Sequence, residues 1–385
     1  MSSALINARI FDGERLHTGL NAVIENGRIG RLTSDAVNPE AVRTRDLEGR
    51  LLAPGLIDIQ VNGGGGVMFN DDPCVETIRR MGAAHRHFGT TGFLPTLISS
   101  SPETLLRAVA AVRTALEEKI PGLLGIHLEG PFLNPEYRGI HDDHWFRSLR
   151  DEDFGLFDLP GGARTLLTVA PEMMHPGQIR QLVEAGVIVF GGHSAASYEQ
   201  VRVALQAGMS GFTHLFNAMS PFTSREPGMV GAALADRESW VGLIADGHHV
   251  HPASLAVALA AKTAGRSLLV TDAMASVGQE AKSFEWNGQT VTAADGCCRL
   301  PGGALAGSDL DMMTAVRNTM RFAGMDRYEA LRMASTYPAQ ALGLDTELGY
   351  IKPGYRASMI ELDENMVLKN SWIDGRPPEA TEENT

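Results

Sequence analysis

The sequence has few cysteines, no long apolar run and no excess of positive charge. Its three cysteines (Cys74, Cys297 and Cys298) form neither a disulfide framework nor a C-x-x-C motif, so we expect a reducing compartment and a cytoplasmic protein. No run of about 18 apolar residues occurs, and the N-terminal residues lack a basic segment followed by an apolar one. The formal net charge of −13 argues against nucleic-acid or anionic-membrane partners, which require a basic face.

Composition and length indicate a globular protein with more than one domain. Hydrophobic residues make up 44% of the chain and charged residues 21%, with glycine and proline dispersed rather than clustered. This profile is typical of globular proteins. Because 385 residues exceed the usual single-core domain, the length favours a large barrel with a smaller accessory domain.

Both ends of the chain carry the pattern of β structure. Residues 1–52 alternate apolar runs with the turn signals Asp12-Gly13 and Asn26-Gly27, which predicts short antiparallel strands. Residues 348–385 show the same pattern of short apolar runs, in YRASMIEL and MVLKNSWI. Two terminal β segments around a long middle predict one smaller, discontinuous β domain.

The middle of the chain, residues 53–347, alternates short apolar runs with Ala/Leu/Glu/Arg-rich stretches of helical character. Parallel strands need crossovers of about a dozen residues, so this rhythm predicts an α/β fold, a (β/α)8 TIM-like barrel. Residues 281–303 resemble a β hairpin that either joins the β domain or covers the barrel mouth. The predicted strand runs are 56–63, 91–99, 122–130, 163–172, 187–194, 211–217, 239–247 and 267–274.

Polar side chains end several of these runs. In a (β/α)8 barrel the active site lies at the carboxyl ends of the strands, so such residues carry functional weight. Glu129, His193 and His214 offer one carboxylate and two imidazoles, a ligand set for a catalytic metal with one open position for water. Asp272 ends the last run and is placed to accept the proton of that water and return it to the leaving group.

An isolated histidine or aspartate at a strand end is more often a hydrogen-bonded structural group, but the joint occurrence of these four residues favours the catalytic interpretation. We interpret His127 as a polar core residue, since Leu128 separates it from Glu129. The open ligand set suits Zn²⁺ best, and Fe²⁺, Co²⁺ or Mn²⁺ would also bind.

The segments LLAPGLIDIQVNGGGG, GIHLEGPFLNPEYRGIHD, GGHSAA, THLFNAM, IADGHHV and LLVTDAM resemble those of N-acetylglucosamine-6-phosphate deacetylases in the amidohydrolase superfamily, and the likeness runs over nearly the whole chain. The resemblance implies a β-sandwich-like domain beside the barrel and a homodimer. It also implies the same three metal ligands and Asp272 as the catalytic acid and base. Many superfamily members carry His-x-His on the first strand and hold two metals. Here Gln60 and Asn62 stand there, which indicates one metal and two site-lining amides.

The resemblance further implies the residues that bind the phosphorylated amino sugar. His141 would stabilise the oxyanion, and Arg225 and His249 would contact the phosphate, the arginine reaching the neighbouring subunit's site. The remaining substrate contacts would be Ile140, Asn217, Ala218, Leu305, Ala306 and Gly307.

The leading hypothesis is therefore hydrolysis of N-acetylglucosamine 6-phosphate to glucosamine 6-phosphate and acetate, in amino-sugar catabolism and recycling. Two alternatives stay open. The first is a related deacetylase acting on N-acetylgalactosamine 6-phosphate or another N-acyl substrate. The second is a barrel without catalytic activity that serves as a scaffold, which the retention of three ligands and Asp272 disfavours.

Overall fold

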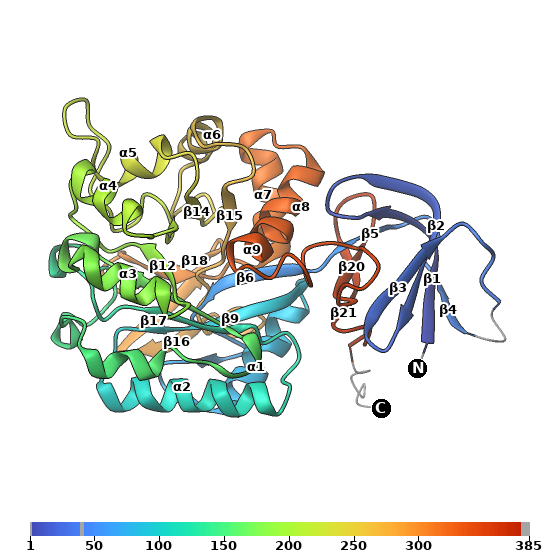
Figure 1. Cartoon of the computed structure of the whole chain (residues 1–385), viewed down its shortest axis with the longest axis horizontal. Helices are drawn as coiled ribbons and strands as arrows, with labels where there is room; N and C mark the ends of the chain where they lie inside the picture. The colour runs from blue at the N-terminus through green and yellow to red at the C-terminus, as the bar shows by residue number, and fades with distance from the viewer. Residues whose placement is uncertain (1, 39–41, 379–385) are drawn as a thin grey trace.

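The computed structural model describes residues 2–38 and 42–378 (Figure 1), and an eight-stranded parallel sheet forms its centre. Each of the eight predicted runs overlaps one strand of this sheet, and strands that follow one another along the chain are neighbours in the sheet, so the barrel prediction is confirmed. The strands are β6 (Leu56–Val61), β9 (Thr90–Ile98), β10 (Gly125–Glu129), β11 (Arg164–Val169), β12 (Ile188–Gly191), β13 (Gly211–Phe212), β14 (Trp240–Leu243) and β15 (Ser267–Leu269).

The barrel closes where the first strand meets the segment that follows the last one. Asp272 N donates to Gln60 O at 3.0 Å, and Asn62 N donates to Ala273 O at 3.0 Å. Deeper in the barrel the hydroxyl of Thr271 donates to the carboxylate of Asp58 at 2.5 Å. We call these contacts between residues 58–62 and 271–273 the seam. The seam places the predicted catalytic carboxylate beside the first strand.

Helices cover the outside of the barrel (Figure 1). The α-helices are α1 (Val75–Arg86), α2 (Pro102–Glu117), α3 (Pro176–Glu184), α4 (Tyr198–Gln206), α5 (Gly228–Ala235), α6 (Pro252–Ala261), α7 (Met312–Ala323), α8 (Arg327–Ala334) and α9 (Thr336–Ala341). Short 3-10 helices occupy Pro135–Tyr137, Asp143–Trp145, Asp151–Leu156, Pro160–Gly162 and Pro171–Met173.

Helix α2 shows how the sequence specifies these elements. Ser101 caps its N-terminus by accepting a hydrogen bond from Thr104 N, and Pro102 occupies the first turn, where its missing N–H costs nothing. Leu105, Val109 and Val112 recur at helical spacing on its buried face. The helix therefore begins where the cap stands and packs its apolar stripe onto the sheet.

A second sheet stands beside the barrel (Figure 1) and combines strands from both ends of the chain, which confirms the separate, smaller β domain. It has its own core, which includes Leu5, Ile24 and Trp372. The expectation that residues 1–52 form only antiparallel strands was wrong for its last two strands, since β4 and β5 pair in parallel with β1. The predicted boundary at residue 52 falls inside β5. The seven strands are β1 (Ser2–Phe11), β2 (Leu16–Glu25), β3 (Arg28–Thr33), β4 (Arg43–Asp46), β5 (Leu51–Pro54), β20 (Met359–Leu362) and β21 (Leu368–Trp372).

The stretch predicted as a hairpin forms part of a four-stranded antiparallel sheet, made of β16 (Ser283–Trp286), β17 (Gln289–Ala294), β18 (Cys297–Arg299) and β19 (Leu305–Ser308). This sheet adds no strand to the seven-stranded sheet. Its apolar face packs instead against Met68, Ile98 and Met274. Ser308 in β19 bridges to Ala273, and β7 (Gly63–Gly64) and β8 (Val67–Met68) form a small ladder beside it. The four strands therefore lie on the barrel next to the seam.

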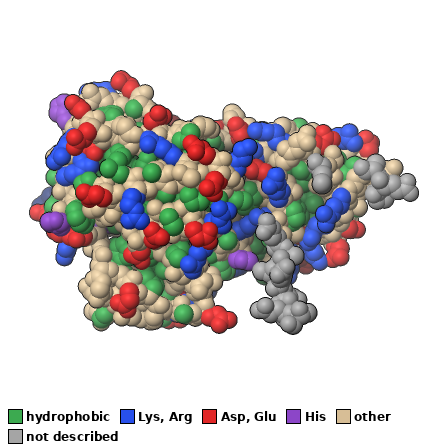
Figure 2. Space-filling model, turned by 90° about the horizontal axis from the view of Figure 1, so that it is seen from below, with side chains coloured by type: hydrophobic (Ala, Val, Ile, Leu, Met, Phe, Trp, Pro, Cys, Tyr) green, Lys and Arg blue, Asp and Glu red, His purple; other side chains and the backbone are tan. Residues whose placement is uncertain are grey.

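The surface mixes charges of both signs. Figure 2 shows acidic and basic side chains interspersed on the face that it presents. Within residues 2–38 and 42–378, no helix combines the length and the apolar character needed to cross a bilayer.

Gly125 is a position where the barrel tolerates no side chain. Its φ is +150°, and a Cβ there would overlap the carbonyl oxygen of Arg164 on the neighbouring strand β11. We expect Gly125→Ala to lower the free energy of unfolding by about 3 kcal/mol or more, from backbone strain together with the clash. Urea unfolding followed by circular dichroism measures the change. Gly155→Ala is the matched control, since a Cβ at exposed Gly155 meets no atom within 4 Å; equal stability of the two variants would contradict the prediction.

Candidate active site

Three predicted ligands converge at the carboxyl ends of their strands. Glu129 is the last residue of β10, and His193 and His214 each stand two residues beyond β12 and β13. Oε1 of Glu129 lies 3.1 Å from Nε2 of His193 and 2.9 Å from Nε2 of His214, and the two imidazole nitrogens are 3.0 Å apart. All three residues are buried. Parallel strands thus bring residues 129, 193 and 214 to one point.

Hydrogen bonds set the protonation of this cluster. Nδ1 of His193 lies 2.8 Å from the carbonyl oxygen of Tyr137. Because a carbonyl only accepts, Nδ1 carries a proton, and Nε2 is the nitrogen that faces Glu129. Burial acts to raise the pKa of Glu129, but the hydrogen bonds and charges of His193 and His214 outweigh it and hold that pKa well below its usual range. The site therefore presents an ionised carboxylate beside imidazole nitrogens.

This arrangement fits a divalent metal. A tetrahedral ion at about 2.0–2.1 Å from three ligand atoms holds them about 3.3 Å apart, close to the separations seen here. Two imidazoles and one carboxylate are also the ligand chemistry of open catalytic sites. Nδ1 of His214 is buried without a hydrogen-bond partner among the described residues, so that ring is oriented through its Nε2 side alone. In the part of the chain that is described, this is the one cluster of three or more His, Cys, Asp or Glu with metal-ligand spacing.

Asp272 lies at the seam and is held by the two amides that replace His-x-His. Its Oδ1 accepts from Asn62 Nδ2 at 2.6 Å and from Gln60 Nε2 at 3.1 Å. Gln60 Nε2 also lies 3.2 Å from Oε1 of Glu129, so it links the two carboxylates. Burial, together with the charge of Glu129, raises the pKa of Asp272. Gln60 and Asn62 therefore orient this carboxylate through one oxygen and leave Oδ2 available.

Backbone strain marks the same positions. His193, His214 and Asp272 have φ values of +49°, +34° and +52°, in the left-handed region that non-glycine residues rarely adopt. Each such residue costs on the order of 1–3 kcal/mol and persists where the surrounding structure enforces it, a pattern typical of functional sites. Three of the four central residues carry this strain.

His141 lies against the cluster, with its ring centroid 4.4 Å from that of His193. Ser99 N donates to His141 Nδ1 at 3.3 Å, and Ser99 Oγ is 2.9 Å from the same nitrogen. Since a backbone N–H only donates, Nδ1 is an acceptor and the proton of the neutral ring sits on Nε2. Burial and the nearby His193 lower the pKa of His141 well below its usual value, which keeps the ring neutral. His141 thus offers an N–H donor.

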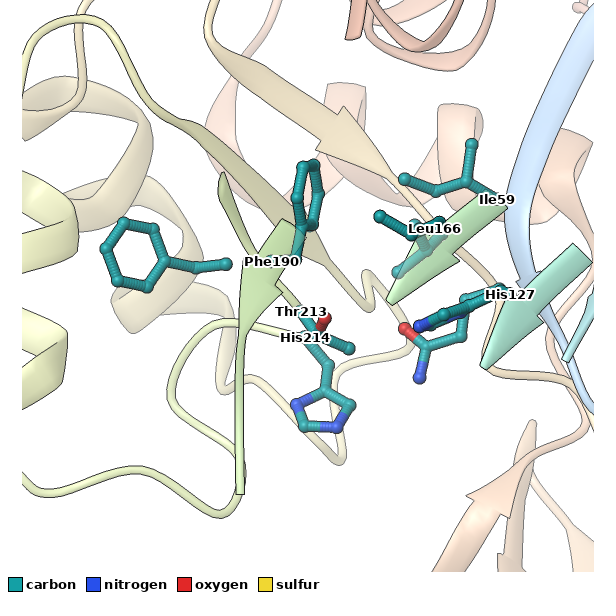
Figure 3. Close-up of a pocket in the computed structure, with 10 residues that line it drawn as sticks. Ile59, His127, Leu166, Phe190, Thr213 and His214 are labelled. Carbon is teal, nitrogen blue, oxygen red and sulfur yellow. The ribbon is translucent and has the colours of Figure 1, made fainter. Parts of the chain in front are cut away.

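A small cavity of about 10 Å³ lies inside the barrel beside the cluster, enough for one water molecule. Figure 3 shows Ile59, Leu166 and Phe190 on one side of it and the rings of His127 and His214 on the other. His127 is hydrogen-bonded to Thr168 at 2.8 Å, and burial lowers its pKa to about 4. It is a neutral polar core residue outside the ligand cluster.

The other predicted substrate residues occupy two places around the cluster. Asn217 Nδ2 donates to His214 O at 3.1 Å, and Ala218 O accepts from Ser194 N at 3.0 Å, so both flank the ligand loops. Ser308 N donates to Asp272 O at 3.0 Å, which brings the preceding residues of β19 next to Asp272. Those residues are Leu305, Ala306 and Gly307.

Three further predicted contacts differ in their surroundings. Ile140 is half-buried against the apolar core beneath β16–β19. His249 follows β14 and is bonded to Asp246 at 2.5 Å. Arg225 lies in an exposed loop, and within residues 2–38 and 42–378 no hydrogen bond or ion pair holds it. The single chain therefore does not bring Arg225 to the cluster through a polar contact.

The sequence reasoning missed Ser99, the carbonyl of Tyr137, and Asp246. Asp246 ends the run SWVGLIADG, so the strand-end signal that selected Glu129 could have found it. Ser99 also ends a strand run, but nothing in the sequence places it beside His141, which is 42 residues away. A backbone carbonyl carries no sequence signal at all.

Residues 51–377 match the model of the amidohydrolase family. The chain belongs to this family. It is 43% identical to the N-acetylgalactosamine-6-phosphate deacetylase of Shewanella sp. (strain ANA-3), over 84% of this chain and 82% of the relative. It is 36% identical to the N-acetylglucosamine-6-phosphate deacetylase of Haemophilus influenzae, over 98% of this chain and 99% of the relative.

Solved structures of this amidohydrolase family agree over nearly the whole length. N-acetylglucosamine-6-phosphate deacetylase from Pasteurella multocida superposes with a TM-score of 0.93 at 34% identity, covering 98% of this chain and 100% of that one. A mutant of the Mycobacterium smegmatis enzyme, in complex with N-acetyl-D-glucosamine-6-phosphate, superposes with a TM-score of 0.89 at 31% identity, covering 98% and 99%. Because the family is one of metal-dependent hydrolases, the prediction of an enzyme is confirmed.

Proposed function

We propose that this amidohydrolase removes the acetyl group of N-acetylglucosamine 6-phosphate and releases glucosamine 6-phosphate and acetate. The observation that carries the proposal is the convergence of Glu129, His193 and His214 within 3.1 Å of one another beside Asp272. The relatives named above act on N-acetylhexosamine 6-phosphates, which supports the substrate class. A scaffold role has no need of this constellation.

The residues divide the chemistry of amide hydrolysis among them. A divalent ion bound by Glu129, His193 and His214 would polarise the amide carbonyl and acidify the attacking water. Asp272 accepts the proton of that water through Oδ2, since Oδ1 is occupied by Gln60 and Asn62. Asp272 then delivers the proton to the nitrogen of the leaving amine, so one carboxylate serves as base and acid in turn.

His141 is proposed to donate its Nε2–H to the amide oxygen as negative charge develops there. We expect His141→Gln to lower kcat by about 10²–10³-fold, the usual cost of losing one oxyanion donor. Steady-state acetate release measures this, with metal content determined in parallel. His144→Gln, at an exposed position of the 3-10 helix Asp143–Trp145, is the control. A kcat within twofold of wild type, with only KM raised, would show that His141 binds the ground state and the transition state equally and is not an oxyanion donor.

Phosphate recognition is proposed for His249 and Arg225. A guanidinium suits the geometry of a phosphate. Arg225 makes no hydrogen bond or ion pair with any described residue, so its guanidinium is available to a partner from another subunit. We therefore propose a homodimer in which Arg225 reaches the neighbouring subunit's site, while Ile140, Asn217, Ala218 and residues 305–307 contact the sugar. Light scattering of the purified protein tests the dimer.

We propose Zn²⁺ as the metal, with Fe²⁺, Co²⁺ and Mn²⁺ as other ions that this ligand set accepts. The three cysteines are free, which fits the proposed cytoplasmic location. The reaction would serve amino-sugar catabolism and recycling.

The test of function is acetate release from N-acetylglucosamine 6-phosphate by the Zn²⁺-loaded enzyme. N-acetylgalactosamine 6-phosphate is assayed beside it, because the relative at 43% identity is a deacetylase of that epimer. A higher kcat/KM on the galactose epimer would assign the protein to this second function. No turnover of either sugar phosphate, with metal fully loaded, would overturn both.

A further inference from the structure

The turn after β14 is organised by one buried carboxylate, Asp246, whose side chain is fully inaccessible to solvent. Its Oδ1 accepts from the backbone N–H groups of His248 and His249, both at 2.8 Å. Its Oδ2 lies 2.5 Å from Nδ1 of His249. The carboxylate thus makes two separate sets of contacts, one to the backbone of the turn and one to a ring.

The contact with the ring determines what His249 presents. Because a carboxylate oxygen only accepts, Nδ1 of His249 carries a proton. Nε2 of His249 has no hydrogen-bond partner within the described residues, yet it is not a buried atom. It is therefore open to solvent, although the side chain as a whole is only 7% exposed. His249 follows the carboxyl end of β14, and the carboxyl ends of the barrel strands also carry Glu129, His193 and His214.

A contact with the β16–β19 sheet also holds the turn after β14 in place. Nε2 of His248 lies 2.8 Å from the carbonyl oxygen of Asp295, in the turn between β17 and β18. Burial acts to raise the pKa of Asp246, but the hydrogen bond and charge of His249 outweigh it and lower that pKa, which keeps the carboxylate ionised beside the ring.

We propose that Asp246 is a positioning residue that holds the His249 ring with Nδ1 protonated, and that it thereby directs Nε2 to the phosphate of the substrate. This inference rests on the proposed function for the identity of the anion. Asp246 itself touches no substrate atom and acts through His249.

The Asp246→Asn variant separates the two sets of contacts. Its Oδ1 still accepts from the backbone of the turn, while Nδ2 replaces Oδ2 and no longer accepts the proton of His249. Calorimetry with glucosamine 6-phosphate and the Zn²⁺-loaded enzyme measures binding without turnover. We expect roughly tenfold weaker binding, the order of one charge-assisted hydrogen bond. In turnover assays KM should rise while kcat stays within about twofold, and kcat/KM on unphosphorylated N-acetylglucosamine should change little.

A double-mutant cycle with His249→Gln distinguishes positioning from a structural role. If Asp246 acts through His249, adding Asp246→Asn to His249→Gln should weaken binding no further. An undiminished effect in that background, equal losses for phosphorylated and unphosphorylated sugars, or unchanged binding by Asp246→Asn would each overturn the inference.

The ring contact is also measurable without any sugar. A low-field proton resonance from Nδ1–H is expected in wild type and absent in both Asp246→Asn and His249→Gln. Failure of wild type to bind or turn over sugar phosphates would count against the proposed function, whereas absence of this resonance in an enzyme that binds and turns over normally would overturn only the role of Asp246.

Discussion

Replacing Asp272 with Asn is expected to lower kcat by about 10²–10⁴-fold, the contribution usual for a general acid and base, while the metal stays bound. The substitution keeps an oxygen in the place of Oδ1, where Gln60 and Asn62 donate, so the side chain remains in position. The amide nitrogen in place of Oδ2 accepts no proton. Acetate release and metal analysis by plasma mass spectrometry give the two measurements.

The control for this substitution is Asp72→Asn, because Asp72 is an exposed carboxylate that pairs with Arg107 on the surface. Its turnover should match wild type. Turnover of Asp272→Asn within about tenfold of wild type would show that another group moves the proton. Loss of metal from Asp272→Asn would show instead that Asp272 is a ligand in its own right.

Removal of one metal ligand is expected to abolish both metal binding and turnover. In Glu129→Gln a neutral amide, a poor ligand for Zn²⁺, replaces the carboxylate that both imidazoles face. Loss of an outer-shell partner alone typically lowers metal affinity about 10–100-fold, so we expect loss of a direct ligand to exceed about 100-fold. Metal titration with a competing chelator gives the affinity, and acetate release follows turnover.

Wild-type enzyme stripped by a chelator should lose turnover in the same way and regain it when Zn²⁺ is restored. Glu199→Gln, on the exposed face of α4, is the control and should keep both properties. Full metal occupancy with normal turnover in Glu129→Gln would contradict the assignment of the cluster. Full turnover of the stripped wild type would contradict a metal-dependent mechanism.

The barrel was predictable because its strands are short, buried runs separated by amphipathic helices, and each run carries its own signal. The capped helix α2, for example, begins where Ser101 and Pro102 predict. The parallel pairing of β4 and β5 with β1 was not predictable, since the first fifty residues contain turn signals but no information on which distant edge a strand joins. The placement of β16–β19 against Met68 and Met274 depends equally on contacts far apart in sequence.

In the candidate site, too, features with a local sequence signal were predictable, and features that depend on contacts distant in sequence were not. Glu129, His193 and His214 could be proposed because the carboxyl ends of barrel strands meet at one face, so residues remote in sequence lie together there. The contacts that orient them were not predictable in this way. Tyr137 acts through a backbone carbonyl, which any residue would supply. Ser99 acts through its backbone N–H and its hydroxyl, and nothing in the sequence places them beside His141. The role of Gln60 and Asn62 as hydrogen-bond donors to Asp272 also needed coordinates, because the sequence showed only that two ligands were replaced.

The seam bears on the order of events in folding. Gln60 and Asp272 are 212 residues apart, so their contact closes a far longer loop than those linking Glu129 to His193 and His214, which span 64 and 85 residues. Longer loops lose more entropy on closure, although the dependence is only logarithmic. A chain folded through its middle strands already brings together Glu129, His193 and His214, the proposed metal ligands, yet Asp272, the proposed proton-transfer group, is not in place. Metal binding can therefore precede catalytic activity. The onset of hydrolysis would then mark the moment at which the segment after the last strand contacts the first strand.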